Sequence, residues 1–389
     1  MSFLKFQADN IFTGTEALAS NHVLITDAKG KIIDIVDETI AGEDIQKFSG
    51  IISPGFINCH CHLELSHLKG KIPEHTGMVD FILNILQQRN ASKEVIENAI
   101  ADAEKEMIEN GIVAVGDICN TNDTLFQKQK NNLYYYNFIE ISGFVPSTAQ
   151  QRFEFGQNIF NQFQTAIPNQ NSIVPHAAYS VSDDLFTLIQ HQSKNKILSI
   201  HNQESIAEES FFLDGKGDFV RLYKELAINI NNFNHPQKSS LLHILSYLTN
   251  ASKTILVHNC TTSKKDIEEV KKQSDIKLTQ FYLCLCVLAN RYISNGLPDE
   301  IVFENNLEKI VIGTDSFASN HSLNILEEIK TIKQAYPQTS EFDLLRFATY
   351  NGAVALNINN KFGSLSKGLQ PGVILIENFT TCTKPKKLV

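Results

Sequence analysis

The sequence predicts an α/β protein, a (β/α)8 TIM-like barrel with a small β-sandwich domain made from both chain termini. Three observations lead to this prediction. Eight strand-like runs follow one another between residues 50 and 316, and most are separated by stretches with helical periodicity. Polar side chains stand at the ends of these runs, where a barrel gathers its reactive groups. Residues 1–50 and 360–389 both carry strand and turn signals. An open, doubly wound sheet is the alternative, but no glycine-rich phosphate loop follows the first strand.

The two ends of the chain are predicted to form one small domain. The stretch "HVLITDAKGKIIDIVD" (22–37) has two apolar runs around a turn at Ala28-Lys29-Gly30, which is a hairpin signal. The stretch "FGSLSKGLQPGVILIENF" (362–379) has glycine and proline punctuation followed by a strand-like run. We therefore predict a β-sandwich domain from residues 1–50 plus 360–389, and a barrel domain over 51–359.

The middle of the chain alternates between strand and helix patterns. Helical periodicity is clear in 78–89 and 92–111, and the second stretch stops at Gly111. Parallel strands joined by helices are the pattern of a barrel. The eight predicted strands are a run near 51, then 111–118, 133–143, 171–179, 196–202, 253–259, 276–286 and 309–316.

Composition excludes several classes of protein. The chain has 389 residues and a net charge of −9, and its one basic cluster is "KPKK" at 384–387, so nucleic-acid binding is not expected. The sequence has no run of about 18 apolar residues, so no membrane span is expected. The N-terminus does not resemble a signal peptide. Seven cysteines, an odd number, fit no small disulfide framework. We therefore expect a cytoplasmic protein with reduced thiols.

Histidines and carboxylates concentrate at the predicted strand ends. In a barrel these ends meet at one mouth. Five of the twelve histidines occur at the ends of four strands, and acidic residues accompany them. The residues are His60 and His62 after strand one, Asp117 and Asn120 after strand two, His176 after strand four, His201 and Glu204 after strand five, His258 after strand six and Asp315 after strand eight.

The stretch "CHCH" (59–62) offers two candidate ligand pairs, and only one of them can face the mouth, because side chains alternate along a strand. Cys59 and Cys61 with Cys284 and Cys286 would make a structural zinc site. The apolar neighbours of the second cysteine pair favour core packing instead. Three imidazoles and one carboxylate, from His60, His62, His201 and Asp315, suit Zn²⁺ or another divalent first-row metal with a position left for water. Such a metal lowers the pKa of bound water to about 7, which makes hydroxide available.

Five motifs give the chain its resemblance to a known family. They are "PGFINCHCHLE", "VPHAAYSVS", "LSIHNQES", "LVHN" and "IGTDSFASN", in this order along the chain. With them the sequence resembles the amidohydrolase superfamily, in the branch of cyclic-amidine deaminases and chlorohydrolases. Within that branch it is most similar to aminodeoxyfutalosine, S-adenosylhomocysteine and adenosine deaminases.

The resemblance implies a role for each motif residue. One divalent metal ion, Zn with Fe or Mn as alternatives, would be held by His60, His62, His201 and Asp315. The catalytic residues would be Glu204, which passes protons to a ring nitrogen, His258, which orients the attacking water, and Asp315, which takes a proton from that water. His176, Glu64 and Asn290 would contact the substrate. Binuclear relatives have a lysine on strand four, which "SIVPHAAY" lacks, so one metal is expected.

One alternative and two departures accompany these roles. Glu204 also fits a helix-capping carboxylate, since negative charge is favoured at a helix start. Relatives usually have proline where this chain has Val287, and Ala-Asp where it has Pro371-Gly372.

The predicted function is that of a metal-dependent hydrolytic deaminase of an aminated purine-type substrate, which includes nucleosides. Metal-activated hydroxide would attack the amidine carbon and ammonia would leave. 6-Amino-6-deoxyfutalosine is the first substrate to consider, with adenosine-like compounds, S-adenosylhomocysteine and guanine as others. A chlorohydrolase, a guanine or cytosine deaminase or a cyclic amide hydrolase is the alternative reading, and a non-catalytic barrel scaffold is a third. A small molecule is the expected partner, and the resemblance leaves a homodimer open.

Overall fold

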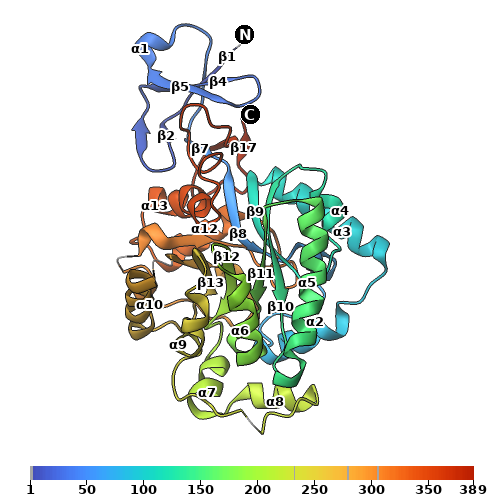
Figure 1. The fold of residues 1–389 in the computed structure, drawn as a ribbon. Coiled ribbons are helices and arrows are strands. Elements are labelled where there is room, and N and C mark those ends of the chain that lie inside the picture. Colours follow the sequence, from blue (N-terminus) through green and yellow to red (C-terminus); the bar gives the residue numbers. More distant parts are fainter. Residues whose placement is uncertain (1–2, 232, 278–279, 305) are drawn as a thin grey trace.

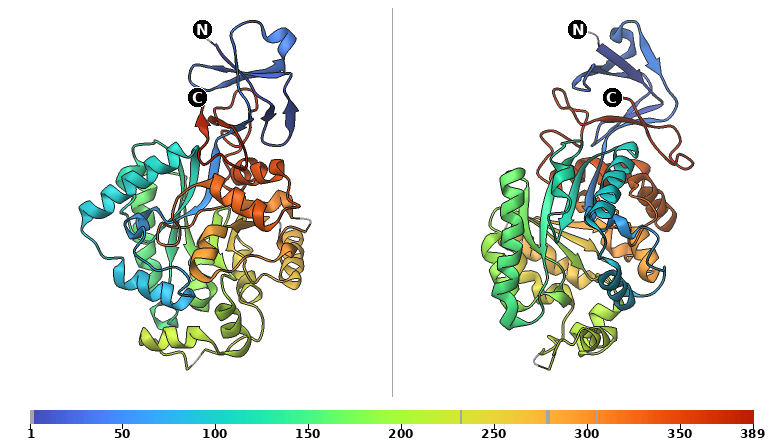
Figure 2. Two further views of the ribbon diagram at one scale, coloured as in Figure 1. Left: turned by 180° about the vertical axis from the view of Figure 1, so that it is seen from behind. Right: turned by 90° about the vertical axis from the view of Figure 1, so that its right-hand side faces the viewer.

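The computed structural model describes residues 3–231, 233–277, 280–304 and 306–389. The protein is α/β, with two four-stranded parallel sheets in its main part and two small sheets at one end (Figure 1). Both chain termini lie at the small sheets, so the ends of the sequence meet in space (Figure 2).

All strands of the main part run parallel within their sheets. Their residues are almost all buried, as expected for a parallel sheet covered by helices. The first sheet has the order β11-β10-β9-β8, with β8 Phe56–Cys61, β9 Ile112–Cys119, β10 Tyr134–Ile141 and β11 Asn171–Pro175. The second has the order β12-β13-β14-β15, with β12 Ile197–Asn202, β13 Lys253–His258, β14 Gln280–Leu285 and β15 Ile310–Ile312.

The two parallel sheets touch along both of their edges. One parallel bridge joins Cys61 to Asp315 and another joins Ala177 to His201. The backbone N–H of Asp315 donates to the His60 carbonyl at 3.1 Å, and the N–H of His201 donates to the His176 carbonyl at 2.9 Å. These contacts bring the carboxyl ends of β8, β11, β12 and β15 to one region.

Helices lie around the strands of the main part (Figure 2). The predicted helices at 78–89 and 92–111 are present as α2 and α3. Ser92 caps α3 by accepting a hydrogen bond from Val95 N–H, and Gly111, at φ 78°, follows its end. The main-part helices are α2 Met78–Gln88, α3 Lys93–Glu109, α4 Leu125–Lys128, α5 Ala149–Ala166, α6 Asp183–Gln192, α7 Ile206–Asp214, α8 Asp218–Glu225, α9 Ser240–Ile244, α10 Lys264–Lys277, α11 Val287–Ser294, α12 Ile325–Ala335, α13 Glu341–Arg346 and α14 Gly352–Ala355. Within the described residues no helix is long and apolar enough to cross a membrane.

The two small sheets share one hydrophobic cluster, which includes Phe6, Leu24, Ile52 and Val373. One sheet has the order β5-β4-β1-β6, with β1 Phe3–Gln7, β4 His22–Asp27, β5 Ile32–Asp37 and β6 Ile45–Lys47, and the short helix α1 Glu38–Ala41 follows β5. The other has the order β17-β16-β7-β2-β3, with β2 Asn10–Phe12, β3 Ala17–Ala19, β7 Ile51–Pro54, β16 Val373–Ile376 and β17 Lys386–Lys387. The hairpin predicted over 22–37 is confirmed as the antiparallel pair β4–β5.

Several strand predictions differ from the structure, and the strand predicted over 171–179 ends at Pro175. The run near 51 is β7, which pairs with β2 and β16 in a small sheet, so the parallel sheet begins with β8 instead. Gly55 separates the two strands, and a side chain there would meet Val113 Cγ1 at 2.4 Å. Residues 276–277 end α10, β14 begins at Gln280, and 278–279 fall outside the described residues. The eighth strand is shorter than predicted and ends at Ile312.

Candidate active site

The histidines of β8 and its end point into one buried cluster. The Nε2 atom of His62 lies 3.2 Å from the Nε2 atom of His60 and 3.2 Å from that of His201. Cys59 and Cys61 occupy the alternate positions and are fully buried in the hydrophobic core, as are Cys284 and Cys286. The imidazoles, and not the thiols, therefore meet at the strand ends.

Asp315 completes this cluster from the turn after β15. Its Oδ1 lies 3.5 Å from His60 Nε2 and 3.3 Å from His62 Nε2, and its Oδ2 accepts a hydrogen bond from Ser319 Oγ at 2.5 Å. Burial alone would raise the pKa of Asp315, but the hydrogen bond with His60 and the electrostatic interactions with the His62 and His258 rings hold that pKa well below its usual range. Asp315 is therefore a carboxylate at neutral pH.

His201 is held with its Nε2 toward the cluster. Its Nδ1 lies 3.0 Å from the backbone carbonyl of His176, which can only accept a hydrogen bond, so Nδ1 carries the proton. Glu140 Oε1 lies 3.4 Å from the same nitrogen. A carbonyl or carboxylate behind an imidazole is the usual way to fix a metal-ligating histidine.

The spacing of these atoms fits one metal ion. Ligand atoms about 2.1 Å from a tetrahedral Zn²⁺ lie about 3.4 Å from one another, close to the 3.2–3.5 Å separations seen among His60, His62, His201 and Asp315. Three imidazole nitrogens that face one another cannot all be satisfied by hydrogen bonds among themselves. Burial lowers the pKa of His62 to about 4, which keeps this ring neutral and able to bind a cation.

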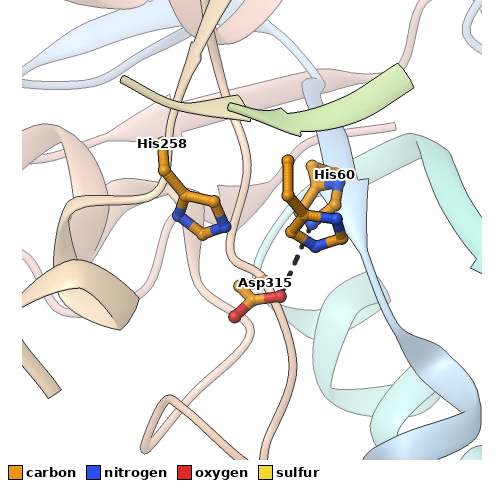
Figure 3. A group of neighbouring side chains, drawn as sticks. His60, His258 and Asp315 are labelled. Carbon is orange, nitrogen blue, oxygen red and sulfur yellow. Dashed lines mark ion pairs between the residues drawn. The ribbon is translucent and has the colours of Figure 1, made fainter. Parts of the chain in front are cut away.

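His258 approaches the same cluster from the end of β13. Figure 3 shows His60, His258 and Asp315 directed toward one another, and ligand atoms of His60, His201, His258 and Asp315 lie within 4.8 Å of each other. His258 Nδ1 pairs with Asn290 Oδ1 at 2.7 Å, which turns Nε2 toward Glu204 Oε1 at 3.3 Å. His258 therefore lies between the cluster of candidate ligands and Glu204.

Glu204 is a buried carboxyl beside the cluster, with 6% of its surface exposed. Burial, helped by the negative charges of Asp315, Glu208 and Glu140, raises the pKa of Glu204 well above its usual range. The two carboxyl groups of the site thus have opposite tendencies, because their surroundings lower the pKa of Asp315 and raise the pKa of Glu204.

A cavity of about 580 Å³ opens onto this cluster. Its polar end contains His62, His176, His201, Glu204 and Asp315. One wall is apolar and is formed by two helices and the segment after the second. The wall residues on α2 are Met78, Phe81, Ile82, Ile85 and Leu86. Those on α8 and the segment after it are Leu222, Tyr223, Leu226 and Ile228. Arg89 and Arg152 also line the cavity.

The three predicted substrate contacts have different positions. His176 lines the cavity, and its Nδ1 pairs with Ser180 Oγ at 2.6 Å. Glu64 and Asn290 are not among the lining residues. Glu64 Oε2 accepts hydrogen bonds from the backbone N–H groups of Asn120 and Thr121, both at 3.0 Å, and Asn290 orients His258. In this structure both act on the site through neighbouring residues.

Asp117 lies beside the site and contacts Lys128 and the backbone after His62, and not a ligand histidine. Its Oδ2 forms a fully buried ion pair with Lys128 at 2.5 Å, and its Oδ1 accepts the backbone N–H of Leu63 at 2.9 Å. This bond fixes the chain directly after His62. Val287, where relatives are expected to have proline, is the first residue of α11, a position at which proline and other residues are both tolerated.

Sequence reasoning missed the apolar wall and Ser319. The wall residues of α2 occur at helical spacing. Apolar side chains at this spacing can pack in a hydrophobic core or line a cavity, and the spacing alone does not distinguish the two. Ser319 lies four residues after Asp315, and no strand pattern marks it. Arg152 and Glu140, which no strand-end motif marks, also line the cavity.

We expect Glu64→Gln to reduce the pH dependence of stability. Burial raises the pKa of Glu64 from 4.5 to about 7. The folded state therefore binds more protons than the unfolded state between these values, and the stability from this group is lost as pH rises through about 7. The fall in the free energy of unfolding between pH 5 and pH 8 should be smaller in the variant, by on the order of 1–3 kcal/mol. Urea unfolding at both pH values measures it, and equal falls in both proteins would contradict the expectation.

Comparison with known proteins places this site in a family. The model of the amidohydrolase family matches residues 51–388. The aminodeoxyfutalosine deaminase of Nitratiruptor is 24% identical over 346 residues, covering 85% of this chain and 79% of that protein. The solved structure of Helicobacter pylori aminofutalosine deaminase in complex with methylthio-coformycin superposes with a TM-score of 0.83 at 22% identity, over 99% of this chain and 100% of that one. An adenosine deaminase from Xanthomonas campestris with bound zinc has a TM-score of 0.70 at 18% identity, over 96% of this chain and 84% of that one.

The family match covers both parallel sheets and the whole candidate site. The resemblance predicted from the five motifs is therefore confirmed: the chain belongs to the amidohydrolase family.

Proposed function

We propose that the protein is a metal-dependent hydrolytic deaminase of an adenine-type nucleoside. The observation that carries this proposal is the meeting of His60, His62, His201 and Asp315 with the buried carboxyl of Glu204 at the polar end of one cavity. The similarity to aminodeoxyfutalosine and aminofutalosine deaminases supports the reaction class.

In this proposal the eight parallel strands close into a (β/α)8 barrel over 51–359, and the small sheets form a sandwich domain from 1–50 and 360–389. The bridges Cys61–Asp315 and Ala177–His201 support closure, because they join the two parallel sheets at both edges. The cluster shared by the two small sheets supports the sandwich.

One metal ion would be held by His60, His62, His201 and Asp315. Zinc is our first choice, because a structural neighbour was solved with bound zinc, and iron and manganese are alternatives for the same donors. When bound, such an ion supplies the chemistry of a Lewis acid, which makes water a strong nucleophile at neutral pH.

The side chains divide the proton transfers of the reaction. Deamination adds one water across the amidine carbon and releases one ammonia. Asp315 takes a proton from the water, while Glu204, whose pKa is raised by burial, gives one to the ring nitrogen so that the ring does not accumulate negative charge. When the C–N bond breaks, the proton held by Asp315 passes to the departing amino group, which leaves as ammonia, and the added hydroxyl returns a proton to Glu204. His258, whose Nε2 faces Glu204, hydrogen-bonds the oxygen added to the ring. His176, on the cavity wall, contacts the purine.

The cavity supports a substrate larger than a free base. A volume of about 580 Å³ falls in the range of pockets for drug-sized molecules. Its apolar wall on α2 and α8 would accept an apolar 5′ substituent, and Arg89 and Arg152 would pair with an anionic group on it. 6-Amino-6-deoxyfutalosine is therefore the first substrate to test, before 5′-deoxyadenosine and adenosine.

Ammonia release tests the proposal. Zinc-loaded protein is mixed with 6-amino-6-deoxyfutalosine, 5′-deoxyadenosine, adenosine, S-adenosylhomocysteine and guanine, and each product mass is measured. We expect release from at least one nucleoside, with replacement of NH2 by OH. Metal-bound protein that releases no ammonia from any of them would refute the proposal and would favour dechlorination or ring opening at the same site.

We also propose that the enzyme works on its small-molecule substrate in the cytoplasm. All seven cysteines are unpaired in the structure, which suits a reducing compartment. The net charge of −9 argues against nucleic acid as a partner.

A further inference from the structure

Glu204 stands on a segment that has no regular secondary structure. Residues 203–205 connect β12 to α7, and Gln203 adopts a positive φ of 48°. The backbone N–H groups of such a buried segment need partners outside it. The side chain of Glu208 accepts hydrogen bonds from two of these N–H groups. Glu208 Oε1 accepts the N–H of Gln203 at 3.3 Å, and Glu208 Oε2 accepts the N–H of Glu204 at 3.0 Å.

This arrangement is not the usual cap of a helix start. Ser205 and Glu208 have the spacing of a capping box, and Ser205 Oγ accepts the N–H of Glu208 at 3.3 Å. In a capping box the glutamate returns to the N–H of the N-cap residue itself. Here Glu208 reaches the two residues before Ser205 instead. Its carboxyl therefore holds the segment that carries Glu204.

The burial of Glu208 needs a compensating benefit. The side chain is fully buried, and it has no lysine or arginine ion-pair partner within the described part of the chain. A buried carboxyl without a cation is costly. Two backbone hydrogen bonds offset part of that cost, and they are made at the position that fixes Glu204.

We propose that Glu208 is a positioning residue that fixes the backbone of Gln203 and Glu204, so that the Glu204 carboxyl faces His258 and the cavity. The inference rests on the proposed function, in which Glu204 transfers protons.

Two variants test the catalytic side of this inference. Glu208→Gln keeps one acceptor oxygen and turns an amide toward the other N–H, and Glu208→Met removes both acceptors at similar size. We expect kcat to fall about tenfold in Glu208→Gln and up to about 100-fold in Glu208→Met. KM should stay within about threefold and the bound metal should be unchanged, because neither substrate contacts nor ligands are altered. The matched control is Glu104→Gln, which changes a buried carboxyl of α3 that does not line the cavity.

Amide hydrogen exchange tests the positioning itself, without any substrate. In Glu208→Met the amides of Gln203 and Glu204 should exchange at least about tenfold faster than in wild type, while peptides from α3 stay unchanged. If Glu208→Met fails to fold, Glu208→Gln is used for both measurements. Unchanged exchange at these two amides, or a kcat within twofold of wild type, overturns the inference. A wild-type protein that turns over none of the nucleosides refutes the proposed function instead, and the exchange data still decide whether Glu208 holds this segment.

Discussion

Replacing Glu204 by glutamine is expected to lower kcat by about 10²–10⁴-fold, the usual contribution of a general acid or base, while the bound metal stays in place. Glutamine has nearly the same shape as protonated glutamate, but it cannot give up a proton at neutral pH. Glu204 lies 3.3 Å from His258 and lines the cavity, and it is not one of the four proposed ligands. Proton transfer should therefore fail while metal binding continues.

The measurement combines steady-state ammonia release with metal analysis of the same preparation. Glu104→Gln is again the control, since it replaces a buried carboxyl outside the cavity and should keep wild-type turnover. Turnover of Glu204→Gln within tenfold of wild type would remove Glu204 from the mechanism and leave it as a residue that packs beside His258.

Asp315→Asn is expected to remove both metal and activity. Asp315 Oδ1 lies within 3.5 Å of both His60 and His62, and this carboxylate is the anionic member of the proposed ligand set. Asparagine is neutral and a poorer ligand, so the metal affinity should fall by at least about 100-fold, beyond the loss typical of altering a residue behind a ligand. Deamination should disappear with the metal.

Thermal unfolding measures this loss without relying on activity. A metal that binds the native state raises Tm by an amount that grows with the ratio of its free concentration to its Kd, so added zinc should raise the Tm of metal-free wild type and have little effect on Asp315→Asn. Asp183→Asn is the control, because Asp183 pairs with His243 at 3.1 Å, away from the cavity. An equal zinc-induced rise in Asp315→Asn and wild type would show that Asp315 is not a ligand.

Several features of this protein could be predicted from the sequence alone. Alternation along a strand places His60 and His62 on one side and Cys59 and Cys61 on the other, and the structure has this arrangement. The helices at 78–89 and 92–111 were predicted from periodicity and their end signals. The order of the motifs identified the family, which the match over 51–388 confirms. Local spacing is sufficient for the first two conclusions because each depends on residues close together in the chain, and the order of the motifs can be read along the chain without knowing which segments meet in space.

Other features depend on which segments meet in space. The run at Ile51–Pro54 and the strand Phe56–Cys61 are both apolar, and only pairing with β16 or with β9 assigns them to different sheets. Glu64 has the residue type of a substrate contact, yet its carboxyl accepts the N–H groups of Asn120 and Thr121, more than fifty residues away.

The sequence by itself was sufficient to predict the candidate metal ligands, since a metal needs particular side chains and their types and spacing can be read from the sequence. Only the tertiary structure decided which residues line the cavity. The apolar wall of the cavity comes from α2, and from α8 and the segment after it, which are far from α2 in sequence, and an apolar side chain looks the same in the sequence whether it faces a core or a cavity.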